Sequence, residues 1–321
     1  MKRVLGLIMH SKAATIVAAL LCISMWWLSL DSQPSLLPSG IAAIAYSALG
    51  IYLMRINKRT AFNIPCNSPL AGTLFLMGCA LVPQMATSLM PMTQLILLAS
   101  ACSLLLHTYR VNDAMGSYFI AFVLIGAASL ISPTLLFVAP LLLVCCPLLK
   151  SLHIRTILAS LLGLLLPYWV IVCVLFLTDT PIPVDTFVEG LLSPTSSAPH
   201  KELHLVNDYK LPFAAIQMLW LLLLTIPSII ATFFSRSILK ARTQSSLYFL
   251  TTTMLLALVF IAIFPALYTT MIPLLLLANA ISGSAFFVDR NNMGSRIYFL
   301  IMMIVWLLMI ALSVWNIFTT Y

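Results

Sequence analysis

The chain has 321 residues, of which 62% are hydrophobic and only 7% are charged, and its formal net charge is +8 at pH 7. About a quarter of the residues in an ordinary soluble domain are charged, so 16 basic and 8 acidic side chains cannot cover a water-soluble core of this size. These numbers exclude a soluble globular protein. They predict an all-α polytopic membrane protein, with residues 1–321 forming a single integral membrane domain.

Apolar runs of membrane-spanning length follow one another along the chain. A helix needs about 20 apolar residues to cross a hydrocarbon core of about 30 Å. The first run is longer than the apolar region of a signal peptide and lacks a small-residue cleavage site, so we expect it to stay uncleaved. Length and proline positions predict about eleven spans, at 13–30, 40–54, 70–90, 92–107, 117–149 (two spans), 157–177, 213–234, 247–264, 266–287 and 297–318.

The run at 117–149 is too long for one span and short for two. It has no charge between Asp113 and Lys150, and as one straight helix it would measure roughly 50 Å. Ser132 lies in its middle and precedes Pro133, which disfavours the α conformation at the residue before it. We therefore predict a short, proline-broken intramembrane hairpin.

The positions of the basic residues test this hairpin. Basic residues gather in cytoplasmic loops. With eleven spans and the N-terminus inside, 14 of the 16 lie inside, and only Lys201 and Lys210 lie outside. A single span at 117–149 would invert everything after it and leave nine of 16 inside, which is almost no bias. The rule therefore favours the hairpin and places the C-terminus outside.

Residues 178–212 form the long extracytoplasmic loop of this topology. Five acids and two lysines give it a net charge of −3. Its apolar residues follow helical spacing over 184–192, with Asp185 and Glu189 on the opposite face. We predict a short interfacial helix on the outer leaflet, acting either as a lid over a lipid-side cavity or as a plain spacer.

Two further positions carry charge at the predicted membrane surfaces. Asp31 follows the first span and is the candidate catalytic residue, because a carboxylate there can act as a general base toward a lipid-linked substrate; alternatively it only ends the span. Arg110 lies in the polar turn 107–113 and can hold a partner or a headgroup phosphate; alternatively it is a topology charge, with Asp113 as N-cap of the next helix.

Nothing in the sequence predicts a metal or a cofactor. The seven cysteines form no CxxC pair, and six of them lie in apolar segments. The motif HKELH at 200–204 has Lys201 where a metalloprotease motif needs glutamate after the first histidine. The net positive charge is explained by topology, and no basic stretch is interleaved with aromatic residues, so we expect no nucleic-acid partner.

The predicted spans hold no charged residue near their centres. Ion-coupled transporters usually place ionisable groups there. Gln84, Gln94 and Asn279 are the deep amides, and they are typical of interhelical hydrogen bonding, although they would also line a transport pathway.

Residues 70–180 contain, in order, a proline-broken apolar pair, the turn HTYRVNDAMGS, the segment FVLIGAASLISPTLLFVAPLLL, a short basic loop and LLGLLLPYW. This order resembles an uncharacterised family of polytopic inner-membrane proteins of Bacteroidota. The resemblance implies a multi-pass protein of the bacterial inner (cytoplasmic) membrane. The hairpin contains a glycine and proline pattern formed by Gly126, Ala127, Leu130, Pro133 and Pro140. This pattern resembles a helix–turn–helix of the GT-C glycosyltransferases that use polyprenyl-phosphate sugars. That resemblance implies a catalytic acid after the first span, the position of Asp31, although the loop 31–39 has no acidic pair.

The sequence therefore predicts an integral membrane protein of unassigned activity in cell-envelope biogenesis, with a GT-C-like scaffold that lacks catalysis. Two alternatives stay open, a glycosyltransferase acting on the external face and a transporter of a lipid or an uncharged solute. The expected partner is membrane lipid, with polyprenyl phosphate as the candidate.

Overall fold

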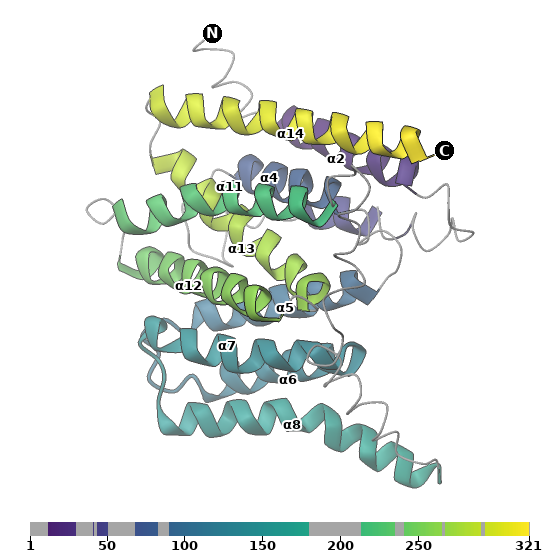
Figure 1. The fold of residues 1–321 in the computed structure, drawn as a ribbon. Coiled ribbons are helices and arrows are strands. Elements are labelled where there is room, and N and C mark those ends of the chain that lie inside the picture. The colour runs from purple at the N-terminus through teal and green to yellow at the C-terminus, as the bar shows by residue number, and fades with distance from the viewer. Residues whose placement is uncertain are drawn as a thin grey trace. The chain divides into compact units, whose positions relative to one another are not determined.

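The computed structural model describes residues 12–29, 41, 44–50, 68–82, 90–179, 213–234, 241–264, 267–289 and 293–320. Every regular element in these ranges is helical, which confirms the all-α prediction (Figure 1). The elements are α2 (Lys12–Ser29), α4 (Ser68–Ala80), α5 (Met90–His107), α6 (Met115–Ile131), η2 (Pro133–Phe137), α7 (Val138–Cys145), η3 (Cys146–Leu149), α8 (Ile154–Leu177), α11 (Phe213–Phe234), α12 (Ala241–Ile263), α13 (Tyr268–Asp289) and α14 (Met293–Thr320).

Most of these helices agree with the predicted spans to within a few residues, but α4 is shorter. It ends at Ala80, whereas the sequence predicted a helix continuing to residue 90. Its last turn tightens, because the Leu81 N–H donates to the carbonyl of Gly78 at 3.1 Å. Val82 then precedes Pro83, and proline disfavours the α conformation at the residue before it.

The contacts group the chain into two compact units. Unit 1 comprises 1–92, 200–243 and 276–321, and unit 2 comprises 93–199 and 244–275. Helix α13 contributes its first residues, 268–275, to unit 2 and the remainder to unit 1.

The core of unit 1 is built from α4, α11 and α13, with α2 and α14 packed against it. Small residues allow close approach: a Cβ added at Gly78 would overlap the side chain of Leu276, and one added at Gly283 would touch Ser228 at 3.6 Å. Helix α14 is tied to this core by the buried Trp306 indole, which donates to the carbonyl of Met77 at 2.9 Å. That carbonyl lies in the tightened last turn of α4.

In unit 2 the predicted hairpin is confirmed as a local structure. Helix α6 ends at Ile131, Ser132 is extended (φ −140°, ψ 110°), and Pro133 opens η2. The second limb then continues through α7 and η3 to Leu149, side by side with α6 (Figure 1).

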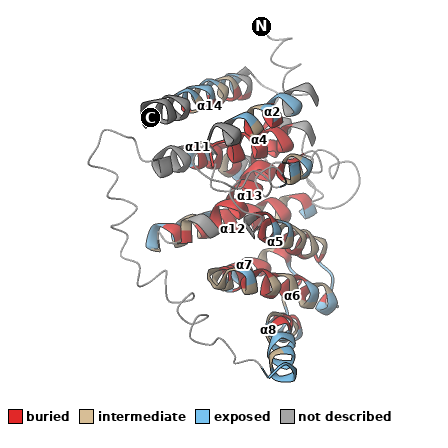
Figure 2. Cartoon of the chain, turned by 90° about the vertical axis from the view of Figure 1, so that its right-hand side faces the viewer, coloured by how far each residue is buried: buried red, intermediate tan, exposed pale blue. Residues whose placement is uncertain are grey.

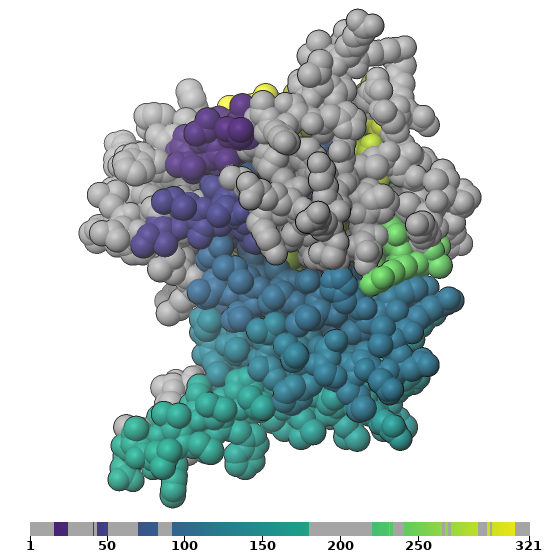
Figure 3. Space-filling model, turned by 180° about the vertical axis from the view of Figure 1, so that it is seen from behind, coloured from purple at the N-terminus to yellow at the C-terminus, as the bar shows by residue number. Residues whose placement is uncertain are grey.

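Helix α8 packs on α6 through one narrow face in the first half of its length. The buried residues of that face are Thr156, Ser160, Gly163 and Pro167, which follow helical spacing and are small or compact. Beyond Pro167 no residue of α8 is buried, and Figure 3 shows this end of the helix (teal) projecting past the rest of unit 2.

Two helices in the described residues are long and apolar enough to cross a membrane. They are α8, with 24 residues, and α12, with 23. They differ in burial, since most of α8 is exposed whereas half of the most apolar stretch of α12 is buried (Figure 2).

Candidate functional site

Of the four residues singled out by the sequence, the structure describes one. Asp31, Asp185 and Glu189 lie outside the described residues, as does the predicted helix at 184–192. Arg110 is described and exposed. A pocket lies beside the turn that contains Arg110, at one end of unit 2.

The two ends of the hairpin are joined beside this turn. The backbone N–H of Arg110 donates to the carbonyl of Leu149 at 3.2 Å, which links the turn after α5 to the end of η3. Arg110 (φ 56°) and Lys150 (φ 55°) both adopt the left-handed conformation, which ends helical segments abruptly. The polar segment before α6 and the basic segment before α8 are thereby brought to the same end of the unit.

A buried hydroxyl network fixes this arrangement. The hydroxyl of Ser151, which follows the hairpin, lies 3.1 Å from the hydroxyl of Thr108 and 3.0 Å from that of Tyr118. All three groups are buried, and a buried hydroxyl without a partner would cost about 1–3 kcal/mol. The network therefore holds α5, α6 and the segment before α8 in one relative position.

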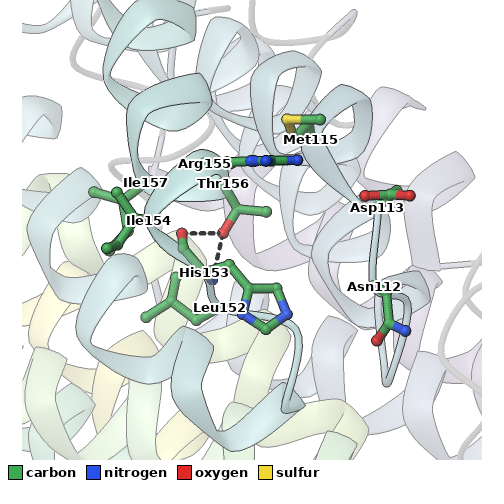
Figure 4. Close-up of a pocket in the computed structure, with 9 residues that line it drawn as sticks. All are labelled: Asn112, Asp113, Met115, Leu152, His153, Ile154, Arg155, Thr156 and Ile157. Carbon is green, nitrogen blue, oxygen red and sulfur yellow. Dashed lines mark hydrogen bonds between the residues drawn. The ribbon is translucent and has the colours of Figure 1, made fainter.

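A pocket of about 650 Å³ lies between these segments (Figure 4). Asn112 and Asp113 face it from the turn before α6, and His153 and Arg155 face it from the start of α8. The other lining residues are Met115, Leu152, Ile154, Thr156 and Ile157. The pocket thus has a polar wall at the turn and a second wall, at the start of α8, that carries both polar and apolar side chains.

The start of α8 is locked by a local pair of hydrogen bonds. The Thr156 hydroxyl accepts from the backbone N–H of His153 at 2.8 Å and donates to the His153 carbonyl at 2.7 Å (Figure 4). Threonine three residues into the helix can bond back to the chain before the first turn, as in a capping box. His153 and Arg155 are therefore presented from a rigid backbone.

The charges of the pocket are opposed across it. Asp113, His153 and Arg155 are all exposed, so their polar groups meet solvent or a ligand at the pocket mouth. A carboxylate accepts hydrogen bonds, and a guanidinium donates up to five of them in a planar fork. The pocket can therefore hold a small molecule that carries both a negatively charged group and a positively charged group.

One expectation about this turn is wrong, and the role expected of Arg110 stays a prediction. Asp113 is not the N-cap of α6: that position is Ala114, with no side-chain hydrogen bond, and the Asp113 side chain lies at the pocket instead. Arg110 does not line the pocket, and its guanidinium lies over the ring of Tyr109, 5.6 Å from the ring centre.

The sequence interpretation missed His153 and Arg155 as pocket residues, because it treated the loop 150–155 as a source of topology charge. The signal that could have found them is the hairpin itself. Two limbs of similar length return the chain to the end from which it came, so the polar residues before and after the hairpin must meet.

A second polar cluster lies buried in unit 1, between α11 and α13. Asn279 is fully buried; its side-chain oxygen accepts from the Ser228 hydroxyl at 3.5 Å, and the Ser282 hydroxyl donates to that of Ser228 at 2.9 Å. Within the described part of the chain, the side-chain nitrogen of Asn279 has no hydrogen-bond partner. Gln94 is also buried, and Gln84 lies outside the described residues. This cluster joins helices, as the sequence predicted for deep amides.

The described residues include no group of three or more histidine, cysteine, aspartate or glutamate side chains placed to hold a metal ion. Comparison with known proteins finds no family model, no curated protein and no solved structure that matches the chain.

Proposed function

We propose that this protein is a multi-pass integral protein of the bacterial inner membrane, with about eleven spans, that serves cell-envelope biogenesis as a scaffold without catalysis. The observation that supports this most directly is the surface of α8. Most of this 24-residue apolar helix is exposed, and none of its residues beyond Pro167 is buried. Lipid is the environment in which such a surface is stable.

The exposed side chains of α8 are large and apolar on several faces. Leu162 is 63% exposed and Phe176 is 80% exposed, where a helix packed in a water-soluble protein would expose polar groups. The others include Ile154, Leu158, Leu161, Leu165, Leu166, Trp169, Val170 and Leu177. Continuous apolar patches of this kind mark membrane or protein contacts, and the length of about 36 Å fits a membrane crossing.

The two alternative functions stay predictions. Glycosyl transfer depends on Asp31 and on the loop 178–212, which lie outside the described residues except for Thr178 and Asp179. Transport depends on a polar pathway through the spans. Asn279, a candidate residue for such a pathway, instead accepts a hydrogen bond from the Ser228 hydroxyl at the α11–α13 contact. The resemblance of the sequence to the Bacteroidota family and to GT-C enzymes supports the proposal of envelope biogenesis.

The membrane placement of α8 is tested with introduced cysteines in the full chain. Leu165→Cys lies at the middle of the helix, whereas Ile154→Cys and Asp179→Cys lie at its two ends. Maleimides react with thiolates, which form in water and not in hydrocarbon. In intact membranes we expect a water-soluble maleimide to modify both end positions, when supplied to both sides, and to leave the middle one unmodified, as read by mass spectrometry of each peptide.

Solubilisation and denaturation supply the control, because Leu165→Cys should then react as fast as the end positions. Equal labelling of all three positions in intact membranes would mean that α8 lies in water, and the membrane proposal would be abandoned.

A further inference from the structure

We propose that the pocket between the turn before α6 and the start of α8 binds the headgroup of a phospholipid that carries both a phosphate and a primary amine. The inference rests on the proposed function, since headgroups lie at this pocket when α8 crosses the membrane from this end. The ligand class follows from the opposed charges of the two walls.

The wall formed by the start of α8 fits the phosphate. Arg155 and His153 both line it, and the guanidinium matches the planar, two-point geometry of phosphate oxygens. Both side chains extend from the first residues of a helix whose backbone is held by the Thr156 hydrogen bonds. Their positions are thus set before a ligand arrives, which reduces the entropy lost on binding.

The wall formed by the turn fits the amine. The carboxylate of Asp113 accepts hydrogen bonds from an ammonium group, and the neighbouring Asn112 offers an amide oxygen. A trimethylated ammonium has no N–H to donate, and a headgroup that ends in a hydroxyl has no positive charge. This wall therefore selects ethanolamine over choline and glycerol headgroups.

The remaining lining suits the lipid portion of the ligand. Met115, Leu152 and Ile154 are apolar, and the 79% exposed Ile154 begins the apolar surface of α8. A lipid whose headgroup enters the pocket can therefore lay its acyl chains along α8. A volume of about 650 Å³ is within the usual range for small-molecule sites, about 300–1,000 Å³.

The two walls are held at a fixed separation by the hairpin. Thr108 and Tyr118 belong to the side of the turn, and Ser151 precedes the wall at the start of α8. Their buried hydrogen bonds join the two sides. The pocket is therefore formed by the fold rather than by the ligand.

The test uses the purified full-length protein in mild detergent and native mass spectrometry. It is titrated with phosphatidylethanolamine, phosphatidylcholine and phosphatidylglycerol of identical acyl chains. We expect phosphatidylethanolamine to bind about tenfold more tightly than the other two, as for one hydrogen-bonded charged group. Arg155→Gln should weaken all three lipids by about tenfold, and Arg155→Lys should weaken them less.

Asp113→Asn should leave binding of phosphatidylglycerol unchanged and abolish the preference for ethanolamine. The matched controls are Arg110→Gln, which removes an exposed cation of the same turn outside the pocket, and Asp179→Asn, which removes an exposed acid beyond the far end of α8. Neither control should change lipid binding. All four positions are exposed, so we expect the variants to fold, and size-exclusion chromatography checks this.

The proposal is overturned if the wild type shows no preference for ethanolamine, or if each pocket variant behaves like its control. Competition by glycerophosphoethanolamine as strong as by the intact lipid would assign the pocket to a soluble phosphorylated amine and would overturn the lipid assignment. These failures leave the labelling of Leu165→Cys unaffected, so they are distinct from failure of the membrane proposal.

Discussion

Two glycines determine how closely α6 and α8 approach each other. A Cβ added at Gly126 would lie 2.7 Å from the carbonyl oxygen of Leu164, and one added at Gly163 would overlap that of Phe119. Both obstacles are backbone atoms, which cannot rotate away as the end of a side chain can. The two helices must therefore separate to accept any larger residue.

Gly163→Ala should lower the free energy of unfolding in detergent by about 1–3 kcal/mol, the usual cost of overpacking. The control is Gly116→Ala in the first turn of α6, where an added Cβ meets nothing within 4 Å. Alanine there should be neutral or raise stability by up to about 1 kcal/mol, because it favours the helix. Thermal unfolding of both variants measures the difference, and equal melting temperatures would contradict the close contact.

The buried side-chain nitrogen of Asn279 has no hydrogen-bond partner among the residues that the structure describes. An unpaired buried donor is unfavourable by about 1–3 kcal/mol. Asn279→Leu keeps the size of the side chain and removes that donor, so we expect thermal stability in detergent to rise. A fall in stability would instead show that the hydrogen bond from the Ser228 hydroxyl to the Asn279 side-chain oxygen contributes more than the unpaired donor costs.

At the scale of the elements, the hairpin was predictable from sequence in outline. The charge-free length and Ser132-Pro133 indicated two limbs and located the break between them. The 3₁₀ segments of the second limb were not predicted. Pro133 opens η2 and Pro147 lies at the start of η3, which agrees with the preference of proline for the first turn of a helix.

The buried hydroxyl network of Thr108, Tyr118 and Ser151 should contribute to stability. Tyr118→Phe removes the hydrogen bond to Ser151 and keeps the ring, so the free energy of unfolding should fall by about 0.5–1.5 kcal/mol. Tyr109→Phe is the control, since its contact with Arg110 uses the ring and not the hydroxyl. Both are measured by thermal unfolding in detergent. If Tyr109→Phe lowered the free energy of unfolding as much as Tyr118→Phe, the effect would not come from the hydroxyl network.

At the scale of the whole molecule, the distribution of charge predicts the topology. Reporter fusions after Arg110, Lys150 and Thr195 should read inside, inside and outside, because two crossings by the hairpin return the chain to its starting side. Each position is fused in turn to a reporter that is active only outside the cytoplasm and to one that is active only in the cytoplasm. The active reporter shows on which side the position lies. An outside signal after Lys150 would make the hairpin a single span, and an inside signal after Thr195 would contradict the eleven-span topology.

Most helices and the break in the hairpin were predictable from the sequence, because apolar length, proline and charge act locally along the chain; the end of α4 was not. In the turn at 107–113 the sequence singled out Arg110, whose role stays a prediction, whereas Asp113 and Arg155 line the pocket. This grouping follows from the fold, since side chains 42 positions apart in the chain line one pocket through the closure of the hairpin. That closure depends on the α6–α8 contact at Gly163 and on the hydroxyl network at Ser151, and a local pattern encodes neither.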